Sequence, residues 1–288
     1  MDRDVSRPKP RRKLFGRLRR WLGRRRRNAG PPRRERVSYA ELQALDADVL
    51  AARLAEDPAA AAPYVEAAAV NGATGAMVLW GHMLLEGNGT PMDKPAALRW
   101  FNIAADAGDV EAVNMVGRCH ERGWGTPPDA AAAAERYREA ADRGHAWAQF
   151  NLAELLFQGL PPPADRRGAL RYYVAAARQD HAKARNMLGR FREEGWLHAA
   201  HPAKAFAWYL AAARGGDFRG QFNTARLLAW QGRLDDALPW LRQAVETGIP
   251  EFCGEIAPDL RASPDPRLRE LGEIAQARAG GGLTLPAG

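Results

Sequence analysis

A glycine recurs every 36 residues along much of this chain. It stands at Gly72, Gly108, Gly144 and Gly216, and Asp180 takes the position between the last two. Self-similarity at a fixed period of about 20–50 residues is typical of arrays in which each repeat is one supersecondary unit. A single unit cannot bury its apolar face alone, so neighbouring units must stack into a continuous core. The period therefore predicts an array of five repeats over residues 71–248.

Small and polar residues mark where helices begin and end within each repeat. Glycine recurs inside the first helix at Gly81, Gly117 and Gly189. Because glycine in a helix costs about 1 kcal/mol relative to alanine, we expect a neighbouring helix to approach closely there. The first helix should end on a left-handed glycine, at Gly87, Gly123, Gly159 and Gly195. The second helix should begin after a capping side chain, at Asp93, Asp129, Asp165 and His201.

Composition and repeat pattern together favour helices throughout. Alanine is heavily used and isoleucine is rare, which suits helices because alanine loses no side-chain freedom on folding. The sequence therefore predicts an all-α fold, a superhelical solenoid of helix pairs. We expect a basic arm over residues 1–36 and an N-terminal helix pair over 37–70. Residues 249–288 should hold a closing helix, from Asp265 to Arg278, and a loose tail.

One segment carries a family pattern. The run Gly-Trp-Gly-Thr-Pro-Pro-Asp, from Gly123 to Asp129, is followed by an aromatic residue and an alanine pair at Tyr137 and Ala140. This pattern resembles the Sel1-like repeat, a relative of the tetratricopeptide repeat, and the resemblance extends over residues 64–248. It implies antiparallel helix pairs wound into a right-handed superhelix that binds proteins. It implies neither catalysis nor a cofactor.

No combination of residues in the sequence supports a catalytic, metal or cofactor site. Two Gly-x-Gly motifs lack the following Lys-Ser/Thr of a phosphate-binding loop. His198 and His201 could be half of a metal site, but no cysteine or acidic partner completes the set. Cys119 and Cys253 form no disulfide framework, and Cys119 occupies an apolar helix position. We therefore expect a non-enzymatic protein, with an enzyme as an alternative that substrate screening would test.

By the same resemblance, the first helix of each repeat should line the concave surface and contact a partner protein or peptide. The residues that fall on this face are Asn114, Arg118, Glu121, Trp147, Phe150, Glu154, Phe157, Asn186, Arg190, Phe222 and Arg226. The three aromatic residues of the third repeat are surplus to the core, and aromatics beside arginines are typical interface anchors. Our hypothesis is an acidic or mixed peptide whose carboxylates pair with the three arginines. The alternative is that the aromatics pack against neighbouring helices.

The chain has two parts of opposite charge. Residues 1–36 hold 16 Lys and Arg against 3 Asp and Glu, whereas the remainder holds 26 basic and 31 acidic residues. If Lys13 to Arg27 form a helix, five apolar side chains project within about 120° of one another. They are Leu14, Phe15, Leu18, Trp21 and Leu22, and the basic residues opposite them include Arg17, Arg20 and Arg24.

A basic amphipathic helix of this kind is typical of segments that lie on membrane surfaces. We expect an anionic membrane as its target; nucleic acid is the second candidate, and an acidic protein or a solvated arm are the others. The sequence shows neither a secretory signal nor an apolar stretch of about 18 residues. The leading prediction is therefore a cytoplasmic scaffold for protein–protein interaction, held peripherally at the cytoplasmic face of a membrane. A nucleic-acid-associated accessory protein is the alternative.

Overall fold

The computed structural model describes residues 37, 41 and 47–281, and every regular element among them is a helix. The fourteen helices are α3 (Ala47–Glu56), α4 (Pro58–Val70), α5 (Thr74–Glu86), α6 (Lys94–Asp106), α7 (Val110–Arg122), α8 (Ala130–Asp142), α9 (Ala146–Gln158), α10 (Arg166–Ala177), α11 (Ala182–Glu194), α12 (Pro202–Arg214), α13 (Phe218–Trp230), α14 (Leu234–Thr247), α15 (Pro250–Arg261) and α16 (Pro266–Ala279). The all-α prediction is confirmed for this part of the chain.

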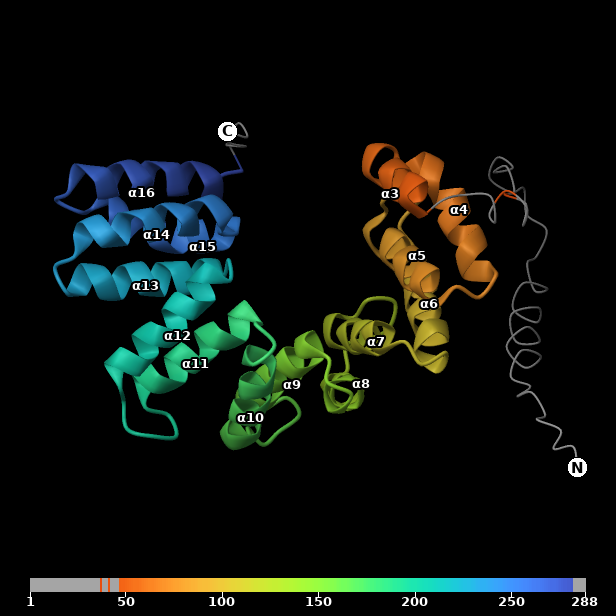
Figure 1. The fold of residues 1–288 in the computed structure, drawn as a ribbon, viewed down its shortest axis with the longest axis horizontal. Coiled ribbons are helices and arrows are strands. Elements are labelled where there is room, and N and C mark those ends of the chain that lie inside the picture. Colours follow the sequence, from red (N-terminus) through yellow and green to blue (C-terminus); the bar gives the residue numbers. More distant parts are fainter. Residues whose placement is uncertain (1–36, 38–40, 42–46, 282–288) are drawn as a thin grey trace, which may run out of the picture.

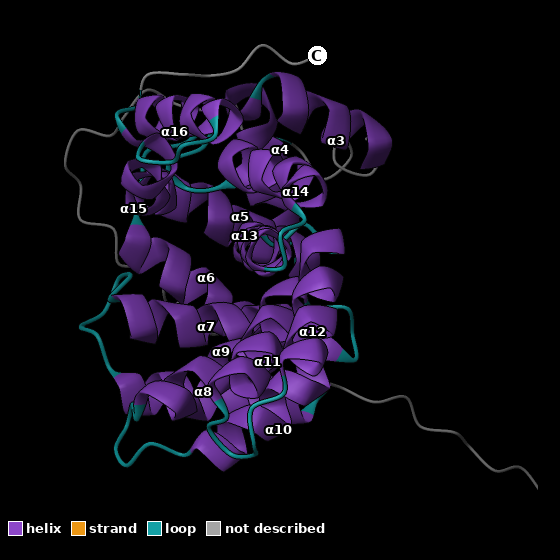
Figure 2. Ribbon diagram, turned by 90° about the vertical axis from the view of Figure 1, so that its left-hand side faces the viewer, coloured by secondary structure: helices purple, strands orange, loops and turns teal. Residues whose placement is uncertain are grey.

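The helices pack in sequential pairs that stack into one curved array. Each helix contacts chiefly its neighbours in sequence, from α3 and α4 at one end to α15 and α16 at the other. The two ends of the array face each other across an open middle, with α7 and α9 on the inner side of the curve and α8 and α10 on the outer side (Figure 1). A second view shows the same stack of helices from its side (Figure 2).

Five of these pairs correspond to the predicted repeats. Unit one is α5 and α6, unit two is α7 and α8, and unit three is α9 and α10. Unit four is α11 and α12, and unit five is α13 and α14. We call the first helix of each unit helix A and the second helix B.

The helices of the array begin and end where the capping residues predict. The side chains of Asp93, Asp129 and Asp165 each accept a hydrogen bond from a backbone N–H in the first turn of helix B, at 2.8–3.0 Å. His201 caps helix B of unit four through Nδ1, at 3.4 Å. Gly87 and its equivalents end helix A with φ between 68° and 75°, a conformation that suits glycine because it lacks a Cβ. Both expectations are confirmed.

The recurring glycines inside helix A lie against an aromatic ring of helix B in the same unit. A Cβ added to Gly117 would lie 2.7 Å from Cδ1 of Tyr137, and one added to Gly189 would lie 2.5 Å from Cδ1 of Tyr209. The expected close approach is therefore confirmed, with a side-chain ring rather than a backbone as the neighbour. Protein cores are packed too densely to admit another atom at such distances.

A further helix pair closes each end of the array. At the N-terminal end, the pair is α3 and α4, and the side chain of Asp57 caps α4. At the C-terminal end, α16 begins after the capping Asp265 and covers nearly the same residues as the predicted closing helix. Its partner α15 has no counterpart among the predicted helices, because Pro250 and Pro258 obscure its pattern. Pro250 stands in the first turn, where no backbone donor is needed, and Pro258 is exposed.

Candidate protein-binding surface

The residues predicted to contact a partner lie on helix A of units two to five. On α7 they are Asn114, Arg118 and Glu121; on α9, Trp147, Phe150, Glu154 and Phe157; on α11, Asn186 and Arg190; on α13, Phe222 and Arg226. Two of these helices, α7 and α9, form the inner side of the curved array (Figure 1). The side chains differ widely in exposure and in their contacts, so they fall into separate groups.

The two asparagines are part of the packing between units. Asn114 is 3% exposed and Asn186 is 5% exposed. Asn151 donates a hydrogen bond from Nδ2 to Oδ1 of Asn114 at 3.1 Å, and Asn223 donates in the same way to Asn186 at 2.9 Å. Each bond joins helix A of one unit to helix A of the next, and buried amides require such partners. The sequence placed both residues on the groove surface, but they support that surface from within.

Glutamates of helix A accept hydrogen bonds from buried tyrosines of helix B. The pairs are Tyr137 with Glu121, Tyr173 with Glu154, and Tyr209 with Glu193, at 2.5, 2.5 and 2.7 Å. Burial, together with the neighbouring carboxylate, raises the pKa of all three phenols, so they remain protonated donors. Sequence reasoning assigned Glu121 and Glu154 to the partner and missed their tyrosines. The tyrosines recur at a spacing of 36 residues, and Glu121 and Glu193 are 72 residues apart. This shared spacing was the signal that could have predicted the pairs.

The three predicted arginines are in different situations. Arg118 lies over the ring of Trp124 at 5.1 Å from its centre, and Arg190 lies over Trp196 at 5.2 Å. Neither makes an ion pair with any residue that the structure describes. Arg226 instead makes an ion pair with the carboxylate of Glu193 on α11, at 2.8 Å. Stacking covers the flat face of a guanidinium and leaves its N–H edge available to a carboxylate.

Two of the predicted aromatic residues pack against the next unit or pair. Phe157 is half-buried, and its ring centre lies 5.7 Å from that of Phe191 and 4.8 Å from that of Trp196. Phe222 is also half-buried and lies 5.6 Å from Phe252 of α15. Aromatic pairs at these separations contribute to stability beyond their buried area. For Phe157 this is the packing alternative, and Phe222 of unit five packs in the same way.

Trp147, which is exposed, and Phe150, which is partly buried, form an aromatic group near the start of α9. Trp147 is 48% exposed, and its ring centre lies 6.4 Å from Phe150 and 4.4 Å from His181. The ring of Phe150 stacks on His181 at 4.7 Å. The ammonium of Lys183 lies 5.4 Å from the Trp147 ring centre. We call Trp147, Phe150 and His181 the aromatic corner, in which neighbouring rings hold the indole while leaving much of it open to solvent.

His181 is the buried member of the aromatic corner. Its Nδ1 accepts a hydrogen bond from the backbone N–H of Ala184 at 3.3 Å and so caps α11. The proton must then be on Nε2, which has no hydrogen-bond partner among the described residues. Burial, with the nearby charges of Lys183 and His145, lowers the pKa of His181 to about 4. The imidazole is therefore neutral at physiological pH.

Four of the helix pairs match a known repeat. The family model of the Sel1 repeat matches residues 74–109, 110–145, 148–181 and 182–217. This chain belongs to the Sel1 repeat family. The four matched segments coincide with units one to four, each spanning one helix A and one helix B. Unit five lies beyond the matched residues and joins the Sel1 array by the way α13 packs on α12.

Solved structures have the same fold. A Sel1 repeat protein from Oxalobacter formigenes has a TM-score of 0.70 at 21% identity, over 80% of this chain and 99% of that chain. A protective antigen of uropathogenic Escherichia coli with an SLR fold has a TM-score of 0.52 at 23% identity, over 84% of this chain and 62% of the antigen. An immunity protein from Pseudomonas aeruginosa has a TM-score of 0.52 at 14% identity, over 72% and 81%. At these identities the likeness concerns the fold. A search of the curated proteins finds no match.

Cys119, His198 and His201 differ in their surroundings. Within residues 47–281, no three His, Cys, Asp or Glu side chains are grouped so that they could hold a metal ion. Cys119 is fully buried, and burial raises the pKa of its thiol to about 12, which keeps it protonated and unreactive. His201 is engaged as a helix cap, and His198 is exposed in the preceding loop.

The membrane-binding prediction concerns another part of the chain. The arm residues named for it all lie within 1–36, outside the described residues. No helix in the described part of this Sel1 repeat protein is long and apolar enough to cross a membrane.

Proposed function

We propose that this protein is a non-enzymatic scaffold that binds a segment of a partner protein on the helix A surface of units two to four. Sel1 repeats generally mediate protein interactions, which supports this assignment. The observation that carries it is the aromatic corner. Trp147 stays 48% exposed even though three neighbouring side chains fix its ring. Large aromatic rings that are held in place before binding are typical hot spots of protein interfaces.

The charges around this surface favour an acidic segment. Lys183 lies beside the indole, and Arg118 and Arg190 lack an ion-pair partner in the described chain. A partner that places an apolar side chain on Trp147 and carboxylates near these groups would be complementary in both shape and charge. Because Arg226 is already paired with Glu193, the segment should run along units two to four rather than toward unit five.

Photo-crosslinking tests this proposal even though the partner is unidentified. The full chain, carrying p-benzoyl-phenylalanine in place of Trp147, is irradiated in the cells that produce it, and the crosslinked proteins are identified by mass spectrometry. Trp230 supplies a matched control, since it is 79% exposed at the end of α13 and makes no described aromatic contact. We expect a discrete partner at position 147 and not at position 230. The same set of proteins at both positions would contradict the proposal.

We further propose that the arm holds this scaffold at the anionic cytoplasmic surface of a membrane. The support is its 16 Lys and Arg within residues 1–36 and the apolar stripe that contains Phe15 and Trp21. Phe15→Glu with Trp21→Glu should abolish sedimentation with phosphatidylserine-containing liposomes, although the net charge of +8 falls by only two. Binding that survives both changes would show that charge alone acts. Binding to DNA that is tighter than binding to liposomes would favour the nucleic-acid alternative. The logarithm of the DNA-binding constant should then fall by about 0.9 per contacted phosphate for each log unit of salt.

A further inference from the structure

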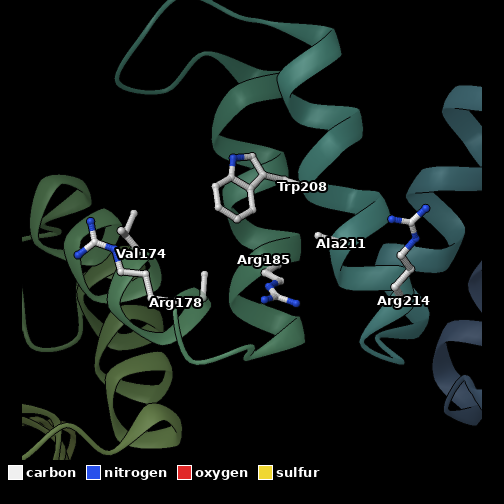
Figure 3. A pocket seen from close by; sticks show the side chains of 7 residues that line it. Val174, Arg178, Arg185, Trp208, Ala211 and Arg214 are labelled. Atoms are coloured by element: carbon white, nitrogen blue, oxygen red, sulfur yellow. The ribbon is translucent and has the colours of Figure 1, made fainter.

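A pocket of about 630 Å³ opens between helix B of unit three and helix B of unit four. Its lining includes Val174, Arg178, Arg185, Trp208, Ala211 and Arg214. Val174 and Arg178 lie on the α10 side, Trp208, Ala211 and Arg214 lie on α12, and Arg185 lies between them (Figure 3). None of these residues belongs to the surface proposed above or to the aromatic corner. The pocket is therefore a second, separate candidate site.

The pocket concentrates positive charge that the protein itself leaves largely uncompensated. Arg178 and Arg214 are exposed, and neither guanidinium makes a hydrogen bond or ion pair with the part of the chain that the structure describes. Arg185 pairs with Asp180, whose own side chain is 85% exposed. Helices α10 and α12 contain no Asp or Glu at all. Of the three arginines, only Arg185 therefore has an acidic partner in the described chain.

Comparison along the repeats shows that this charge is particular to units three and four. Arg178 and Arg214 stand at equivalent positions, 36 residues apart. The same position holds Asp106 in unit one and Asp142 in unit two. Helix packing therefore accepts either sign of charge at the end of helix B. Packing does not require two arginines there.

The remaining lining residues provide an apolar wall beside the arginines. Trp208 is half-buried, and Val174 and Ala211 are partly exposed next to it. Guanidinium groups bind carboxylates through two parallel N–H donors, and an indole ring offers a flat surface to an apolar side chain. We propose that this pocket binds an acidic peptide segment of a second partner protein, in which carboxylates flank an apolar or aromatic side chain. The scaffold would then hold two partners on different surfaces.

A designed probe tests this assignment on the full chain. A fluorescein-labelled peptide Glu-Glu-Leu-Phe-Glu-Glu and its neutral analogue Gln-Gln-Leu-Phe-Gln-Gln are titrated with protein and followed by fluorescence anisotropy. The acidic probe should bind more tightly. Arg178→Asp with Arg214→Asp should weaken that binding about tenfold or more, and both changes should fold because units one and two carry Asp at these positions.

Matched variants separate the pocket from general charge attraction by the arm. Arg138→Asp with Arg242→Asp makes the same charge change at exposed positions outside the pocket, and the arm is present in every form. This control should retain the affinity of the unchanged protein. Equal affinities for the two double variants would overturn the assignment. A benzoyl-phenylalanine form of the probe gives a second test, and crosslinks that map to residues 1–36 alone would also overturn the assignment. Displacement of the probe by a short single-stranded DNA, seen only when the pocket arginines are intact, would assign the pocket to nucleic acid instead.

Discussion

Helix A of unit three differs from helix A of the units on either side of it. Unit two carries Arg118 followed by Glu121, and unit four repeats this arginine and glutamate at the same positions. Unit three has Glu154 and Phe157 in their places. In all three units, a helix A glutamate accepts the hydrogen bond of the buried helix B tyrosine. In unit three that acceptor simply comes from a position three residues earlier.

The difference shows which features of the repeat the fold requires. A buried phenol must have an acceptor, because an unpaired buried hydroxyl costs about 1–3 kcal/mol. The position of that acceptor can change. Because Glu154 supplies the acceptor in unit three, position 157 does not need a glutamate. Phe157 occupies it and packs on Phe191 and Trp196. The same helix also carries the exposed Trp147, so the unit with the altered polar contact is the one that presents an aromatic surface.

The largest effect should come from Gly117, whose counterpart in unit three is Ala153. Gly117→Leu would force atoms into the ring of Tyr137, since even a Cβ would lie only 2.7 Å from it. We expect the free energy of unfolding to fall by about 3 kcal/mol in urea denaturation. Gly75 is the matched control, because no atom lies within 4 Å of a Cβ built on it. Gly75→Leu should change stability by about 1 kcal/mol at most, and equal denaturation midpoints for the two variants would refute the close-packing account.

A smaller effect tests the displaced acceptor of unit three. Glu154→Arg gives unit three the arginine of its neighbours and leaves the Tyr173 hydroxyl without its acceptor, which should cost about 2 kcal/mol. Phe157→Glu places a carboxylate where units two and four have theirs. Phe157→Glu should lower the free energy of unfolding by about 1 kcal/mol less in the Glu154→Arg variant than in the unchanged protein. Additive free energies in this double-mutant cycle would mean that the two positions do not share one role.

The smallest effect concerns the histidines that cap units three and four. His145 hydrogen-bonds through Nε2 to Glu111 at 2.8 Å, whereas the buried Nε2 of His181 has no partner in the described chain. The folded-state pKa of His181, about 4, lies below its ordinary value of 6.5, so the unfolded chain gains a proton first as pH falls. Stability should therefore decline between pH 6.5 and 4, by on the order of 1 kcal/mol.

His181→Asn isolates this contribution, because asparagine keeps a capping oxygen and removes the titrating ring. The variant should show a flatter dependence of its urea midpoint on pH across this window than the unchanged protein. Identical slopes would show that His181 does not titrate as its burial implies.

The repeat, the helix ends and the close packing at glycine could be predicted from sequence because they depend on residues near one another in a 36-residue pattern. The contacts between units could not. The hydrogen bond from Asn151 to Asn114 depends on how one helix pair is rotated on the next, and local pattern does not encode that rotation. The pocket was missed for the same reason. Its arginines Arg178 and Arg214 read in sequence as ordinary charges at helix ends.

The most direct test of the scaffold account is the affinity of the partner captured at position 147, measured by isothermal titration calorimetry. Trp147→Ala should weaken binding about tenfold or more, as expected when an interface hot spot is removed. Trp230→Ala removes an indole that is more exposed, 79% against 48%, and should leave the affinity unchanged. Unchanged affinity for Trp147→Ala, or equal losses for both variants, would contradict the claim that unit three carries the binding surface.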